Sequence, residues 1–182
     1  AVVMAVRMDV AGILDSPSFR AGTATGVGYS RMAFGIACLA EFLRNLGYRA
    51  LPMGNDTALS IPLAIDAGLG ELGRNGLLIT PQYGPRVRLR AMLLESHQET
   101  GFRPTFRVGQ RNPVSSPCEG CPRPCWRACP QNAFVSGVYD RERCVTQMEQ
   151  DESNIPVHTD RASGVSYVEY CRACELACPV GT

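Results

Sequence analysis

The first half of the chain alternates apolar runs with short polar breaks, which predicts strands and helices in turn. Ala1 to Met8 is an apolar, β-branched run typical of a buried strand. Apolar residues recur at helical spacing from Ser30 to Leu46, and Gly47 follows where a C-terminal glycine cap belongs. Tyr48 to Met53 can then return as a strand. This pattern predicts a βαβ unit.

The segments around this unit are shorter and carry more glycine and proline. Residues 16–28 are rich in Ser, Gly, Thr and Pro and predict a loop. Leu59 to Leu72 predicts a short helix entered near Pro62 and broken by glycines, and Leu77 to Thr80 predicts a short strand. Arg86 to Leu94 predicts a further strand with two unlike faces. One face carries Arg86, Arg88 and Arg90, and the other carries Val87, Leu89 and Ala91.

A polar stretch with three prolines, residues 96–117, predicts a linker between two regions. We expect an α/β core over residues 1–112, incomplete at its N-terminal side because it begins in mid-core, and a cysteine-rich domain over residues 113–182. The chain has 182 residues, of which 45% are hydrophobic and 19% charged, and this composition argues against disorder.

The net charge and the length of the apolar runs argue against a nucleic-acid partner and against a membrane span. The formal net charge is +1 and no run of basic residues exists, so we expect no nucleic-acid partner. No run approaches the ~20 apolar residues of a membrane span, so we expect no transmembrane segment. The sequence shows neither a secretory signal nor a twin-Arg leader, so it reads as cytoplasmic as it stands. An exported, membrane-associated form would fit if a twin-Arg leader had been removed, and the compartment stays unknown.

The nine cysteines are distributed unevenly, and eight of them fall between Cys118 and Cys178. The ninth, Cys38, lies among apolar helical residues and is expected to be a buried core thiol. A cluster of closely spaced cysteines in one third of the chain suggests a metal site. Closely spaced C-x2-C pairs cannot join distant elements as disulfides.

The spacing of these cysteines is that of iron–sulfur ligands. The first run is C-x2-C-x3-C-x3-C-P from Cys118 to Pro130, and the second ends as C-x2-C-x3-C-P from Cys171 to Pro179. Two-cluster bacterial ferredoxins use similar runs, in which the fourth cysteine of each run ligates the other cluster. Cross-assignment predicts two [4Fe-4S] clusters. Cluster 1 uses Cys118, Cys121, Cys125 and Cys178, and cluster 2 uses Cys129, Cys144, Cys171 and Cys174.

This assignment uses all eight cysteines, and structural zinc is the weaker alternative because C-x3-C-P occurs twice and is unusual for zinc. The stretch from Gln131 to Asp140 resembles the hairpin that links ferredoxin motifs. The first run also has one residue more between Cys121 and Cys125 than the ferredoxin pattern.

Gly68, Gly70 and Gly73 match G-x-G-x-x-G, but the surrounding residues do not support a dinucleotide site. The preceding segment contains Pro62 and predicts helix or loop, whereas the fingerprint requires a strand there and an acidic residue about 20 positions further on. Together with Gly76, these glycines suggest a winding loop that lets a bulky ligand approach the backbone.

Three stretches of the core resemble a known enzyme family. They are Gly28-Tyr29-Ser30-Arg31-Met32-Ala33, the segment Gly54 to Ser60, and the segment Ile61 to Arg88. Together with the cysteine region they are similar to the corrinoid-dependent reductive dehalogenases. A related version of the third stretch and of the cysteine region occurs in the epoxyqueuosine reductases.

The resemblance implies a nitroreductase-like α/β core that holds a base-off corrinoid (cobalamin), followed by a bacterial-ferredoxin-like domain with two [4Fe-4S] clusters. It implies reductive removal of halogen from a small organohalide, with electrons from reduced ferredoxin, flavodoxin or a membrane donor. Tyr29 falls on the family's proton donor, Arg88 on the cation beside it, and Asn55 on a polar partner in the pocket. The candidate corrinoid contacts are Gly68, Gly70, Gly73, Asn75 and Gly76.

Other interpretations of the same residues remain open. Tyr29 would also suit a core aromatic in the first helical turn, the three strand arginines a solvated face, and Asn55 a turn or helix cap. Two further functions compete with dehalogenation. One is epoxyqueuosine reductase-like tRNA modification, for which we expect an acidic proton donor, and the other is non-catalytic electron transfer by a two-cluster protein.

Overall fold

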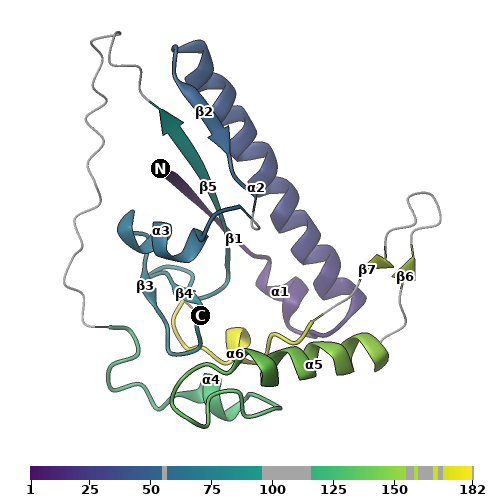
Figure 1. The fold of residues 1–182 in the computed structure, drawn as a ribbon. Helices are drawn as coiled ribbons and strands as arrows, with labels where there is room; N and C mark the ends of the chain where they lie inside the picture. Colours follow the sequence, from purple (N-terminus) through teal and green to yellow (C-terminus); the bar gives the residue numbers. More distant parts are fainter. Residues whose placement is uncertain (55–56, 96–115, 155–157, 160–165, 168–169, 182) are drawn as a thin grey trace.

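A three-stranded antiparallel sheet and one long helix form the core (Figure 1). The computed structural model describes residues 1–54, 57–95, 116–154, 158–159, 166–167 and 170–181. Strand β5 (Val87–Glu95) is central and pairs antiparallel with β1 (Val2–Arg7) and with β2 (Arg49–Pro52). The predicted strands are therefore confirmed. β1 and β2 run in the same direction, as in a βαβ unit, but β5 lies between them.

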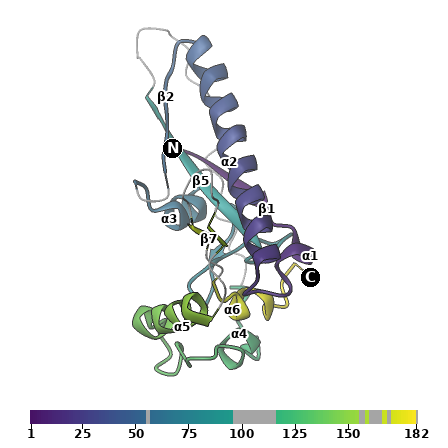
Figure 2. The same ribbon diagram turned by 90° about the vertical axis from the view of Figure 1, so that its right-hand side faces the viewer.

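Helix α2 (Phe19–Asn45) covers one face of this sheet (Figure 2). The buried side chains of Ile36, Ala40 and Leu43 pack with Tyr48 and with Met92 of the central strand. The left-handed backbone at Gly47, with φ +90°, ends the helix, and its amide donates to the Arg44 carbonyl at 2.9 Å. The predicted helix and its glycine cap are therefore confirmed.

The predicted loop over residues 16–28 is wrong, because α2 begins eleven residues earlier than its apolar periodicity suggested. The Ser18 hydroxyl caps the helix by accepting from the Ala21 amide at 3.1 Å. A short helix, α1 (Val10–Ile13), packs against this first part of α2, where Gly12 lies against Ala24. Tertiary packing thus offsets the low helix propensity of the Gly and Thr residues.

Cys38 is exposed, so the prediction of a buried core thiol is wrong. Its neighbours Ile36 and Ala40 face the sheet. A residue two positions from each of them is turned about 200° around the helix and therefore faces solvent.

The glycine-rich stretch folds as the predicted short helix and strand. Helix α3 (Ser60–Asp66) leads into a small hairpin of β3 (Glu71–Leu72) and β4 (Leu78–Ile79). A Cβ at Gly70 would lie 2.9 Å from the carbonyl carbon of Ile79, and one at Gly73 would lie 2.7 Å from the Ile79 side chain. At these two positions the close approach is to the chain's own hairpin.

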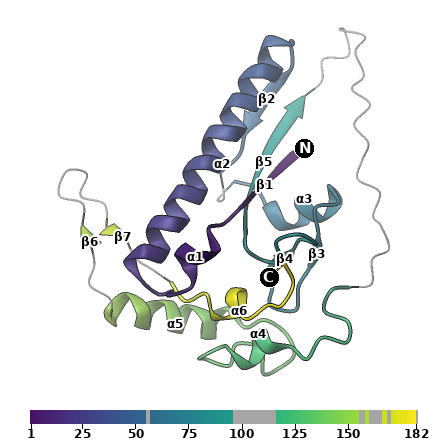
Figure 3. The same cartoon turned by 180° about the vertical axis from the view of Figure 1, so that it is seen from behind.

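The cysteine region lies beneath the core and contains short helices (Figures 1 and 3). They are α4 (Pro124–Arg127), α5 (Arg141–Asn154) and α6 (Ala173–Leu176), with a small pair of strands, β6 (His158–Thr159) and β7 (Ser166–Tyr167). The predicted hairpin over residues 131–140 is wrong. Left-handed backbone at Asn132 (φ 51°) and Gly137 (φ 84°) folds this segment into turns instead. A ferredoxin-like strand arrangement does not appear within the described residues.

The described helices include none that is both long and apolar enough to cross a membrane. Residues 96–115, most of the predicted linker, lie outside the described residues.

The C-terminal segment packs closely against the turn before β5, and this contact makes a testable prediction. Gly84 has φ +56°, and a Cβ there would lie 2.9 Å from the carbonyl carbon of Val180. We expect Gly84→Ala to lower the free energy of unfolding by about 3 kcal/mol, because strain and overlap add. Gly26→Ala is the control, since nothing lies within 4 Å of its Cβ position in the middle of α2. It should raise stability by about 1 kcal/mol in the same urea titration, and equal effects would contradict the packing argument.

Candidate functional site

The clustered cysteines separate into two neighbourhoods in the folded chain. The Cys125 thiol interacts electrostatically with Cys178, Cys118 and Cys121, although Cys178 lies more than fifty residues away in sequence. The Cys174 thiol interacts instead with Cys171, Cys144 and Cys129. These are the two sets that the spacing predicted. The structure brings their members together, and their role as ligands stays a prediction.

Burial and mutual proximity disfavour the ionised form of these thiols. Burial, and then the neighbouring thiols, raise the pKa of Cys174 to about 12. Burial is also the largest cause of the raised pKa values of Cys125, Cys171 and Cys178. Thiolates at these positions therefore need a nearby positive charge, and a bound metal centre supplies one because a coordinating thiol is deprotonated outright.

The described thiols do not form a ready site for a single metal ion. Within the part of the chain that the structure describes, no three His, Cys, Asp or Glu side chains form a group that could hold one metal ion. An iron–sulfur cluster presents several metal atoms to its thiolates, so its ligands share a neighbourhood without converging on one point. Backbone amides also point at sulfur, as at Cys129, where the Ala133 amide lies 3.3 Å from Sγ. Two neighbourhoods of four thiols each match the number of ligands that two [4Fe-4S] clusters need, and cluster binding stays a prediction.

Tyr29 and Arg88 lie beside each other at a cleft in the core. Tyr29 extends from α2 and Arg88 from β5, and the Arg88 Cζ atom lies 5.8 Å from the centroid of the Tyr29 ring. A cavity of about 410 Å³ opens beside them, with walls from α3, the β3–β4 hairpin and β5. This size suits a small organic molecule. Asn55, the third predicted residue, lies outside the described residues.

A buried carboxylate that the sequence analysis did not single out lies against Arg88. Glu175 on α6 is 5% exposed, and its two oxygens lie 3.8 Å from Arg88 Nη1 and 2.8 Å from Arg172 Nη1. Burial lowers the pKa of Arg88, and Glu175 opposes this shift. Arg172 in turn donates to the Thr25 hydroxyl on α2 at 2.6 Å. The position of Glu175 inside C-x3-C-P is the only sequence signal that could have indicated it.

Neutralising this carboxylate gives a second testable prediction. In Glu175→Gln, Arg88 and Arg172 would remain close together and mostly buried without their shared counter-charge. We expect the free energy of unfolding to fall by about 3 kcal/mol in a urea titration. Glu95→Gln is the control, because Glu95 forms an exposed pair with Arg49 at 3.0 Å and should cost less than about 1 kcal/mol. Similar losses in the two variants would show that Glu175 is not the counter-charge of the arginine pair.

The strand arginines do not form a solvated face, so that alternative is wrong. Arg86 is 2% exposed and donates to carbonyl groups of the cysteine region, namely those of Glu175 at 3.3 Å, Cys178 at 3.0 Å and Val180. Arg90 donates to the Met53 carbonyl at 2.9 Å. Arg86 and Arg88 therefore join the core to the cysteine region, whereas Arg90 binds within the core.

Two of the candidate corrinoid contacts, Asn75 and Gly76, lie against the cysteine region. Asn75 is 4% exposed, accepts from the Leu77 amide at 3.2 Å, and directs its amide toward the Cys174 carbonyl at 3.5 Å. Gly76, with φ +77°, lies against the Tyr139 ring, whose nearest atoms are 3.6 Å from the Cβ position. Gly68 has φ +75° and is exposed. Corrinoid contact by these residues stays a prediction.

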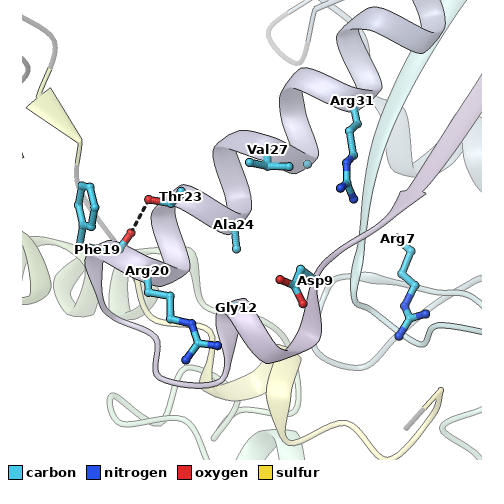
Figure 4. A pocket seen from close by; sticks show the side chains of 10 residues that line it. Arg7, Asp9, Gly12, Phe19, Arg20, Thr23, Ala24, Val27 and Arg31 are labelled. Atoms are coloured by element: carbon cyan, nitrogen blue, oxygen red, sulfur yellow. Dashed lines mark hydrogen bonds between the residues drawn. The ribbon is translucent and has the colours of Figure 1, made fainter.

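A second cavity, of about 450 Å³, lies along the first turns of α2 (Figure 4). Its walls include Asp9, Arg20 and Arg31, and the Thr23 hydroxyl donates to the Phe19 carbonyl at its edge. It contains none of the predicted site residues. Although it is slightly larger than the Tyr29 cleft, we place the chemistry at the cleft, because Tyr29 and Arg88 lie together there and Arg88 also contacts Glu175 of the cysteine region.

Comparison with characterised proteins links the chain to two enzyme groups. No model of a known protein family matches it. It is 41% identical over 151 residues to a tetrachloroethene reductive dehalogenase of Dehalobacter restrictus, which covers 83% of this chain and 26% of that protein. It is 32% identical over 136 residues to an epoxyqueuosine reductase of Vibrio cholerae, which covers 74% of this chain and 33% of that protein.

A solved structure of a reductive dehalogenase, described as suggesting a mechanism for B12-dependent dehalogenation, has the same fold. The TM-score is 0.60 at 25% identity, over 80% of this chain and 22% of that one. The chain spans about a quarter of the length of the dehalogenases it matches.

Proposed function

The chain is related to the tetrachloroethene reductive dehalogenases, and from this premise we propose that it serves reductive removal of halogen from a small organohalide. The observation that carries the proposal is the pairing of Tyr29 with Arg88 at a cleft that adjoins the cysteine region. A tyrosine rather than an acidic side chain stands there, and this does not favour the epoxyqueuosine alternative.

The two thiol neighbourhoods would hold two [4Fe-4S] clusters, each supplying one electron at a time. Reductive dehalogenation consumes two electrons and one proton, breaks one carbon–halogen bond, forms one carbon–hydrogen bond and releases halide. Electrons would enter from reduced ferredoxin, flavodoxin or a membrane donor. A corrinoid, when bound, supplies the metal at which the carbon–halogen bond is cleaved.

The chain's own residues supply the proton and control its release. The Tyr29 hydroxyl delivers the proton to the carbon that loses halogen. A cation beside the phenol stabilises the phenolate that remains when the proton leaves. Arg88 supplies that cation. Glu175 contacts both Arg88 and Arg172 and so fixes the position of the Arg88 guanidinium.

Apolar side chains line the cleft and would bind the organic body of the substrate. They include Leu59, Ile61 and Pro62 of the α3 segment, together with Leu78 and Val87.

Anaerobic reconstitution with iron, sulfide and cobalamin tests the proposal. We expect roughly eight iron per chain from two clusters, stoichiometric cobalt, and halide release when a chlorinated alkene and a low-potential reductant are added. Iron without cobalt would point to an electron-transfer protein. Zinc without acid-labile sulfide would overturn both the dehalogenase proposal and the electron-transfer alternative.

A further inference from the structure

Arg86 is a fully buried cation for which the described part of the chain provides no carboxylate. It is 2% exposed and is the largest of the fully buried side chains. Within the described residues no Asp or Glu oxygen lies within ion-pair distance of it, whereas Arg88 and Arg172 share Glu175. A buried charge without a counter-charge is strongly unfavourable, so a nearby anion is needed to balance it.

The partners of Arg86 point to the position of that anion. All three carbonyl groups that it contacts lie on the segment from Glu175 to Val180, and the central one belongs to Cys178 itself. The positive charge of Arg86 also lowers the pKa of the Cys178 thiol, against the effect of burial. The guanidinium is therefore held beside the cysteine that joins Cys118, Cys121 and Cys125.

We infer that Arg86 is the counter-charge of the cluster on Cys118, Cys121, Cys125 and Cys178, and that it raises the reduction potential of that cluster. The inference rests on the proposed function, because it requires the cluster. Reduction adds one electron and no proton, so the cluster becomes more negative by one unit while Arg86 keeps its charge. A fixed cation therefore stabilises the reduced form more than the oxidised form.

The second cluster should respond less to Arg86. Arg86 contacts the carbonyl of Cys178 itself at 3.0 Å, whereas none of its hydrogen bonds within the described residues goes to Cys129, Cys144, Cys171 or Cys174. Arg86 would thus separate the potentials of the two clusters, favouring the electron on the cluster that includes Cys178.

An EPR-monitored redox titration of Arg86→Gln tests the inference in the full chain loaded with iron and sulfide. We expect the midpoint potential of the cluster that Cys121→Ser removes to fall, and that of the other cluster to move less. Arg86→Lys keeps the charge and should stay close to the unaltered protein. Arg49→Gln removes an exposed arginine and should move neither potential.

The possible outcomes separate the charge from a merely structural role. A Gln variant with full iron and an unchanged potential, or equal shifts in the Gln and Lys variants, would overturn the inference. If Arg86→Gln fails to load iron, Arg86→Met is measured in the same way, because it removes the charge without leaving a buried polar group. Loading by the Lys variant alone supports the inference, whereas failure of all three variants overturns it. Absence of clusters from the unaltered protein would instead refute the proposed function.

Discussion

Replacing Tyr29 with phenylalanine is expected to lower halide release by at least about 100-fold while leaving iron and cobalt contents unchanged. The substitution removes one hydroxyl from a side chain that is 39% exposed at the cleft, so folding should be little affected. It removes the proton that reaches carbon when the halide leaves. Halide release and metal content measured on the same sample separate loss of chemistry from loss of cofactor.

Tyr83→Phe is the matched control for this variant. Tyr83 also lies beneath an arginine, with the Arg7 Cζ atom 5.7 Å from its ring centroid, but it does not line the cleft. A general weakening of tyrosine–arginine contacts would affect both variants, whereas loss of the proton donor affects only Tyr29→Phe. Turnover retained in Tyr29→Phe would remove this residue from the mechanism.

Paired substitutions of the cysteines should show that each cluster takes ligands from both runs. We expect Cys118→Ser combined with Cys178→Ser to remove one cluster, leaving roughly four iron per chain. Cys118→Ser combined with Cys171→Ser should remove both clusters and leave almost none. The difference arises because Cys178 lies with Cys118, Cys121 and Cys125, whereas Cys171 lies with Cys129 and Cys144. Iron and acid-labile sulfide determinations measure it.

Cys38→Ser is the control for this series, since Cys38 is an exposed helical thiol far from both groups in sequence. It should keep the full iron content. If the Cys118 and Cys178 pair also removed both clusters, Cys178 would instead belong with Cys171 and Cys174.

The sequence was most informative where local chemistry is self-contained. Helical periodicity with a terminal glycine predicted the second half of α2, and β-branched runs predicted β1 and β5. It was wrong for residues 19–28, because the helix there depends on a Ser18 cap and on contact with α1 rather than on propensity. It was wrong for Cys38, because periodicity was read without fixing which helical face meets the sheet.

The candidate site also has one part that the sequence predicted and another that only the tertiary structure shows. Cysteine spacing by itself predicted the two thiol sets that lie together in the fold, because the runs resemble those of two-cluster ferredoxins, in which the last cysteine of each run joins the other set. Only the tertiary structure decided that Arg88 lies over Tyr29, that Glu175 joins Arg88 to the cysteine region, and that Arg86 is buried beside Cys178. These contacts join residues up to 92 positions apart. They depend on how the segment from Arg86 to Arg88 meets α2 and the C-terminal cysteine run, and no local pattern in the chain encodes that packing.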